Sequence, residues 1–260
     1  EQLARLTRLP YWRVVHMLLL LDQQPLAAQR LLGESDKAPM VDALCGLAIA
    51  LQSGNDSLKQ GYLARLEILD KQREIPSLYR LLVLLAGGDQ DKIRQESAAV
   101  AAGMGKDVVD EIVAYRGPGR EGELAFLLRA SMFLDMGLNR YGAEVAVKAL
   151  KARPTCQWAA ALVSRCNPRP AVLAEAIAAL RPGGGSLHQA MRTRQLTQER
   201  KFSELAQLYE QALGTDKENI ALQIQHAWAT AACGQHQRAL DLYRRVLDKR
   251  PVPEAANNAA

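Results

Sequence analysis

The feature that most constrains the fold is a set of similar residues that recur at one fixed offset between positions 186 and 251. Four pairs of positions lie 34 residues apart in this stretch: Phe202 and His236, Leu208 and Leu242, Tyr209 and Tyr243, and Leu213 and Leu247. A period of roughly 20 to 50 residues is typical of chains built from copies of one small unit, each burying its apolar side by stacking on its neighbours. We therefore expect an array of repeated units.

Composition favours helices as the elements of these units. Ala and Leu dominate, aromatic residues make up only 5% of the chain, and β-branched runs are scarce. Straight-chain side chains lose little rotamer freedom in a helix, and prolines between apolar segments mark helix ends. The intervals predict paired helices at 11–21 with 25–32, 40–52 with 56–71, and 77–86 with 90–102, followed by a shorter helix at 107–115.

From Glu123 onward the repeated unit has recognisable punctuation. Gly137 takes the turn between two helices, Gly142 a position of close helix contact and Pro154 the end of the unit. Gly234 and Pro251 repeat the turn and the end 97 residues later. This offset divides into intervals of 30, 33 and 34 residues through four leucines: Leu150, Leu180, Leu213 and Leu247.

Period and punctuation together make residues 123–251 resemble four tetratricopeptide repeats, of the kind found in bacterial arrays. The resemblance implies an all-α, right-handed α-solenoid, or superhelix, of antiparallel helical hairpins, with residues 1–122 as more divergent hairpins of the same array. Sel1-like and pentatricopeptide arrays have similar periods and stay open as alternatives. The Trp and Leu-Gly positions of the family's first helices are mostly replaced in this chain.

The end of the chain resembles the opening of a fresh repeat. Residues 252–260 carry the Glu-Ala and Asn-Asn pattern with which such repeats often begin. We therefore expect a truncated repeat and a fragment of a longer array. On this reading Leu240, Tyr243 and Leu247 are partly exposed, because the unit that should cover them is missing.

The resemblance also implies a concave groove lined by the first helix of each hairpin, which takes up a protein or peptide partner. Counting from Gly234 as the fifteenth residue of its repeat gives a set of groove candidates in three units: Ile224, Trp228, Arg194, Gln198, Ser131 and Asp135. A Trp beside an Arg is a frequent pairing in binding hot spots. The alternative is that Trp228 packs between helices as ordinary core.

A second candidate surface is basic. The net charge of +5 is a mild excess, and the segment around residues 181–201 contributes four candidate cations for an anionic partner: Arg181, Arg192, Arg200 and Lys201. An ordinary solvated helix face is the alternative. Aromatic stacking positions do not alternate with these cations, so a nucleic-acid partner is not expected.

Residue types that carry catalysis or bind metals are scattered. The four histidines have no thiol or carboxylate partners at ligand spacing, and no serine stands in a GxSxG elbow. We expect neither an enzyme nor a cofactor or metal site. The longest apolar run, Met17 to Leu21, is too short to cross a bilayer, so we expect no membrane insertion by this segment.

These observations predict a non-catalytic protein–protein interaction scaffold. The repeats resemble bacterial arrays that serve envelope assembly, such as exopolysaccharide export, pilus biogenesis or secretion. The alternative is a regulatory or sensor arm of a transcriptional regulator, or a helical-repeat nucleic-acid binder. The sequence leaves the compartment open between the periplasm or outer membrane and the cytoplasm.

Overall fold

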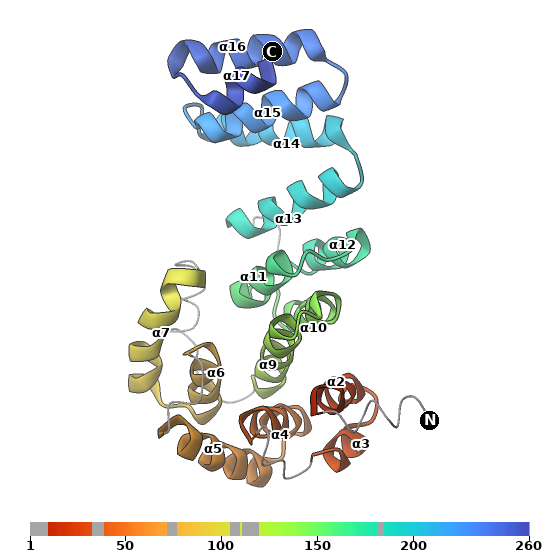
Figure 1. Ribbon diagram of the computed structural model, residues 1–260, viewed down its shortest axis with the longest axis vertical. Helices are drawn as coiled ribbons and strands as arrows, with labels where there is room; N and C mark the ends of the chain where they lie inside the picture. The colour runs from red at the N-terminus through yellow and green to blue at the C-terminus, as the bar shows by residue number, and fades with distance from the viewer. Residues whose placement is uncertain are drawn as a thin grey trace. The chain divides into compact units, whose positions relative to one another are not determined.

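The chain is all-helical wherever its structure is described. The computed structural model describes residues 10–32, 39–71, 77–104, 110, 120–180 and 185–259. Within these ranges the regular structure is fifteen α-helices and no strand. Figure 1 labels these helices along the chain. The helices are α2 (Pro10–Leu20), α3 (Pro25–Arg30), α4 (Pro39–Ser53), α5 (Asp56–Lys71), α6 (Ser77–Gly87), α7 (Gln90–Met104), α9 (Glu121–Asp135), α10 (Asn139–Ala152), α11 (Gln157–Arg165), α12 (Pro170–Ala179), α13 (Gly185–Gln198), α14 (Phe202–Thr215), α15 (Ile220–Ala232), α16 (His236–Lys249) and α17 (Pro253–Ala259).

The three helix pairs predicted before residue 105 are confirmed to within two residues at each end. The shorter helix predicted at 107–115 lies outside the described residues apart from Asp110. The chain divides into two compact units, Glu1–Leu187 and His188–Ala260. In the first unit each helix of a predicted pair contacts its partner, and α4 also packs against α9. In the second, α14, α15, α16 and α17 pack in sequence.

The turns between helices repeat at the predicted intervals. Four residues with left-handed backbone end helices α9, α11, α13 and α15: Gly137 (φ 72°), Asn167 (φ 48°), Arg200 (φ 55°) and Gly234 (φ 80°). They follow one another at 30, 33 and 34 residues, the intervals predicted from the leucines. A left-handed residue after a helix lets the next amide satisfy a free carbonyl of the last turn. Thus Lys201 N–H donates to Leu196 at 2.9 Å, and Gln235 N–H donates to Thr230 at 3.2 Å.

Close helix contact requires glycine at two positions. A Cβ on Gly142 would lie 3.2 Å from the carbonyl oxygen of Ala130, which confirms the predicted close-contact role. A Cβ on Gly46 in α4 would lie only 2.2 Å from ring carbons of Tyr62 in α5. The α4–α5 pair therefore packs with an aromatic ring directly on the backbone of its partner helix.

The last helix corrects one prediction. Tyr243 is only 2% exposed, because it belongs to a core cluster with Ile224 and with Ala255 of α17. The expectation that Tyr243 is partly exposed is therefore wrong. Leu240 and Leu247 are half-buried, as predicted. The short α17 covers the side chain that we expected to lie open.

Candidate functional site

Trp228 lies on the surface of the second unit. It is 40% exposed on α15, and its indole meets the ring of Phe202 edge-on, with centroids 5.7 Å apart. Phe202 is half-buried and packs against the cluster formed by Leu196, Leu205, Tyr209 and Ala229. An aromatic pair of this geometry adds about 0.5–1.5 kcal/mol to simple burial. The core thus supports an indole that still presents apolar area to solvent.

Two of the other predicted groove residues are corrected by their burial. Ile224 is 5% exposed and packs against Tyr243 and Ala255. Ser131 is 1% exposed on α9. Neither side chain can contact a partner unless its neighbours move, because both are buried. The family register places these two positions in the groove, but in this chain they belong to the core.

The remaining groove candidates keep some access to solvent. On α13, Arg194 is half-buried and Gln198 is exposed. In the first unit, Asp135 accepts a hydrogen bond of 2.7 Å from the hydroxyl of Tyr79 on α6. Burial, together with this bond to the carboxylate, raises the pKa of Tyr79 far above its ordinary value, so the phenol stays protonated. Asp135 therefore ties two helices together.

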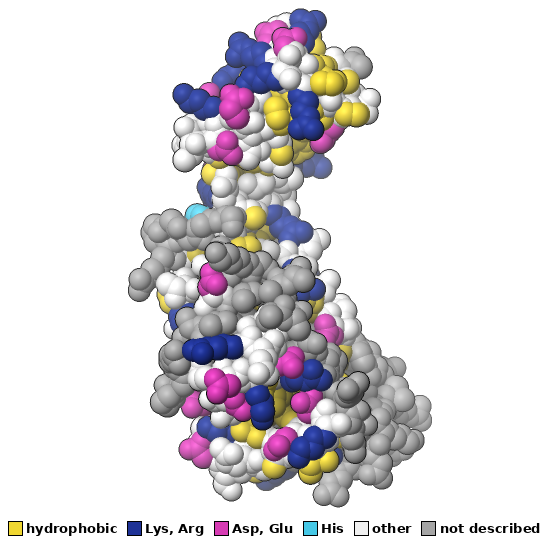
Figure 2. Space-filling view, turned by 90° about the vertical axis from the view of Figure 1, so that its left-hand side faces the viewer, with side chains coloured by type: hydrophobic (Ala, Val, Ile, Leu, Met, Phe, Trp, Pro, Cys, Tyr) yellow, Lys and Arg dark blue, Asp and Glu magenta, His cyan; other side chains and the backbone are white. Residues whose placement is uncertain are grey.

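Two of the four predicted basic-face residues form ion pairs within their own unit. Arg192 pairs with Glu204 at 3.2 Å, and Lys201 pairs with Glu199 at 2.8 Å. The Lys201 hydrogen bond lowers the pKa of Glu199. Arg200 supplies the left-handed turn after α13, and Arg181 lies outside the described residues. Figure 2 likewise shows Lys and Arg interspersed with Asp and Glu on the face it presents.

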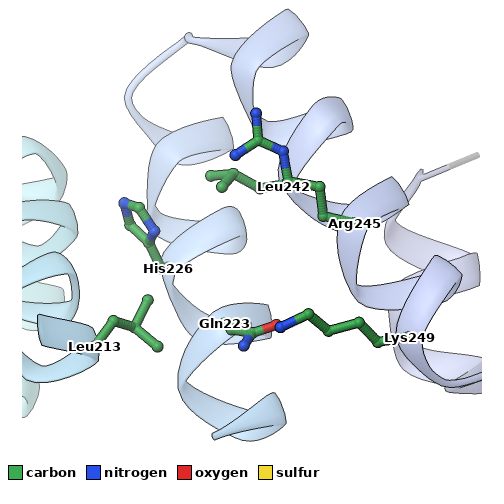
Figure 3. A pocket seen from close by; sticks show the side chains of 6 residues that line it. All are labelled: Leu213, Gln223, His226, Leu242, Arg245 and Lys249. Carbon is green, nitrogen blue, oxygen red and sulfur yellow. The ribbon is translucent and has the colours of Figure 1, made fainter. Parts of the chain in front are cut away.

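The second unit also contains a pocket that the sequence did not predict. It has a volume of about 200 Å³ and lies where the C-terminal end of α14 meets α15 and α16 (Figure 3). Six side chains line it: Leu213, Gln223, His226, Leu242, Arg245 and Lys249. The signal available in the sequence was the basic character of positions 236–250, where five Lys or Arg residues stand against two Asp.

The charge of this pocket comes from α16. His226 is 5% exposed, and burial lowers its pKa; Arg238 lowers it further, while Glu210 opposes the change. The imidazole is therefore neutral near pH 7. Lys249 pairs with Glu218 at 3.2 Å. Among the described residues no hydrogen bond or ion pair joins Arg245 to another group, so its guanidinium remains available at the pocket.

In the first unit a buried arginine, which the sequence did not predict, links α9 to α2 and α4. Arg129 of α9 is 1% exposed and donates to both carboxylate oxygens of Asp22, at 2.7 and 3.1 Å. It also donates to Gln52 at 2.9 Å and to the carbonyl of Leu18 at 2.8 Å. Burial alone would raise the pKa of Asp22, but hydrogen bonds from Arg129 and Lys148 hold it well below its usual range.

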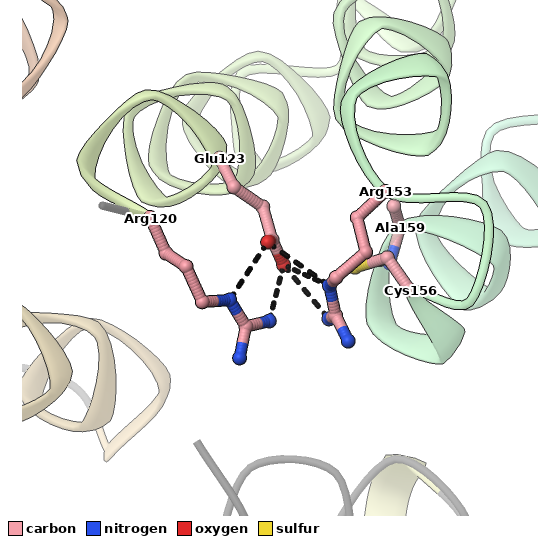
Figure 4. A network of polar contacts seen from close by, with 5 residues as sticks. All are labelled: Arg120, Glu123, Arg153, Cys156 and Ala159. Carbon is pink, nitrogen blue, oxygen red and sulfur yellow. Dashed lines mark hydrogen bonds and ion pairs between the residues drawn. The ribbon is translucent and has the colours of Figure 1, made fainter. Parts of the chain in front are cut away.

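A buried carboxylate, Glu123, lies at the start of α9. Glu123 accepts hydrogen bonds from Arg120 at 2.9 Å and from Arg153 at 2.8 Å (Figure 4). Cys156 lies beside it, and its sulfur accepts a hydrogen bond from the amide of Ala159. Burial, with the nearby Glu123 charge, raises the pKa of the Cys156 thiol to about 12. The thiol is protonated near neutral pH and is a poor nucleophile there.

No metal-binding cluster of three or more His, Cys, Asp or Glu side chains occurs in the described part of the chain. None of the described helices combines the length and the apolar character that crossing a membrane requires. Comparison with protein-family models, with curated proteins and with solved structures found no match.

Proposed function

We propose that this chain is a non-catalytic protein–protein interaction scaffold, built as a right-handed α-solenoid of tetratricopeptide-like repeats. The observation that carries the proposal is the exposed Trp228, which is 40% accessible, whereas the other large apolar side chains described in its unit are buried or half-buried. The recurrence of left-handed helix ends at intervals of 30, 33 and 34 residues supports the repeat architecture.

Trp228 has the properties of a binding anchor. Indole rings are enriched at interface hot spots because they offer a large apolar area with few rotatable bonds. Here the edge-on contact with Phe202 restricts the ring before any partner arrives, so binding would lose less side-chain entropy. A protein or peptide that covers the indole gains the apolar area now exposed to water.

The proposal is tested by quantitative capture of partners from the source cells, with the full-length protein as bait. Trp228→Ala should lose at least one partner that the wild type retains, while Gln207→Ala, a change at an exposed position on α14, should retain it. The melting temperature of each variant is measured in parallel to exclude unfolding. Identical partner sets for all three proteins would contradict the proposal.

The resemblance to bacterial arrays extends the proposal to envelope assembly, in export of exopolysaccharide, pilus biogenesis or secretion. The same capture experiment tests this extension. We expect the partner that Trp228→Ala loses to be a component of the envelope. A cytoplasmic transcription factor or a nucleic acid in its place would contradict the extension to envelope assembly.

A further inference from the structure

The pocket and Trp228 face different directions on α15. Successive residues of an α-helix are rotated by about 100°, so Gln223 and His226 lie roughly 140–160° around the helix from Trp228. The pocket residues from α14 and α16 lie on the same side as Gln223 and His226. The pocket is therefore a separate surface from the one used in the proposal above, and the inference drawn from it stands independently.

The lining of the pocket combines one available cation with apolar walls. Arg245 presents a guanidinium, and Gln223 and the neutral His226 add polar groups between them. Leu213 and Leu242 supply the apolar walls. In Figure 3 the Lys249 side chain extends from α16 toward Gln223 and closes one side of the pocket. The combination suits a planar anion attached to a short aliphatic chain.

The volume and charge of the pocket restrict the kinds of ligand that it can bind. A volume of about 200 Å³ equals the share of roughly seven water molecules in the liquid. A glutamate side chain has five heavy atoms, so the pocket can hold it and part of an adjacent apolar residue. The guanidinium fork of an arginine pairs two donors with the two oxygens of a carboxylate. The excess of basic residues at positions 236–250 adds attraction for an acidic segment of a protein.

We propose that the pocket between α14, α15 and α16 binds a glutamate side chain from an acidic segment of a partner protein. Arg245 pairs with the carboxylate, and Leu213 and Leu242 contact its methylene groups and an adjacent apolar residue. A nucleic-acid phosphate is disfavoured, because the hydrated sugar–phosphate backbone on either side of it would lie against two leucine walls.

The test uses the full chain with methyl-labelled leucine and a capped Glu-Leu dipeptide as the probe, followed by NMR. The probe should shift the methyl signals of Leu213 and Leu242 in a saturable manner and leave the Trp228 indole signal unchanged. The capped Gln-Leu dipeptide should shift them weakly. Arg245→Gln should weaken binding of the Glu probe by at least about tenfold, because the variant loses the charge and the paired donors that bind the carboxylate.

Arg244→Gln is the matched control. It removes the same charge from the neighbouring position of α16, but Arg244 does not line the pocket. It should keep the affinity of the wild type within about twofold, because exposed charges contribute little at a distance. Equal binding of the Glu and Gln probes, equal loss in the two arginine variants, or shifts that move Trp228 instead of the leucines would overturn the proposal. Stronger binding of an oligonucleotide than of the Glu probe through Arg245 would also overturn it.

Discussion

Replacement of the buried Arg129 by methionine tests how the first unit is held together. Methionine is also long and unbranched, so the change removes charge and donors without opening a large cavity. It leaves the carbonyl of Leu18 and the side-chain oxygen of Gln52 without their donor, and Asp22 with Lys148 and the Gln52 amide as its remaining partners. Removing one partner of a buried ion pair costs about 3–5 kcal/mol. Because the Asp22 side chain is 24% exposed, we expect a loss near the lower end, about 3 kcal/mol.

The assay is urea unfolding at pH 7, followed by circular dichroism and fitted for the transition of the first unit. Arg140→Met serves as the control, because Arg140 forms an exposed pair with Glu144 on the same helical turn. Such pairs contribute about 0.3–0.5 kcal/mol, so the control should hardly move the midpoint. A loss below about 1 kcal/mol for Arg129→Met would refute the view that this network stabilises the unit.

The same network predicts an acid-dependent loss of stability. Burial alone would raise the pKa of Asp22, but the hydrogen bonds from Arg129 and Lys148 lower it in the folded chain. A depressed carboxyl pKa stabilises the fold above the unfolded value of about 4, and this contribution disappears as the pH falls through the folded value. Asp22→Asn should therefore be clearly less stable than the wild type at pH 7, and the difference in stability should be smaller at about pH 2.5, below the unfolded pKa. An equal difference at both pH values would contradict this linkage.

Three further outcomes follow from local geometry. Gly46→Ala should destabilise the chain by about 1–3 kcal/mol in urea unfolding, because its Cβ would collide with the ring of Tyr62; wild-type stability would show that the ring moves freely. Arg200→Gly should leave stability unchanged or raise it by up to about 1 kcal/mol, since it relieves a left-handed non-glycine residue. Iodoacetamide at mildly alkaline pH should label the half-buried Cys233 first, with mass spectrometry as the readout. The slow thiols are those that burial protects, and early labelling of any of them would contradict the structure: Cys45, Cys156 and Cys166.

The sequence predicted those parts of the fold that depend on neighbouring residues. Helix ends follow from proline, glycine and the apolar period, so the first three helix pairs are confirmed to within two residues at each end. The turn at Gly234 was identified by its glycine. Arg200 has a side chain that seldom adopts left-handed backbone, and Asn167 one that adopts it less readily than glycine, yet the intervals between leucines gave their spacing correctly.

Contacts between distant segments could not be predicted in this way. Arg129 and Asp22 are 107 residues apart, and nothing in the pattern around either one indicates the other. The position of Ser131 was assigned by counting along a family register, which does not say how tightly neighbouring helices fill the space. Tyr243 was expected at an open end because we took the unit that should cover it to be missing, but the seven residues of α17 suffice to cover it through Ala255.

The central claim is that the exposed face of α15 around Trp228 binds a partner protein. It is tested most directly by replacing Trp228 with the photoreactive benzoylphenylalanine in cells that make the full-length protein, and irradiating them. The account predicts a discrete crosslinked product of higher mass, with a partner identified by mass spectrometry, and no such product from the same replacement at Gln207 on α14. Absence of any product from position 228, or the same products from both positions, would contradict it.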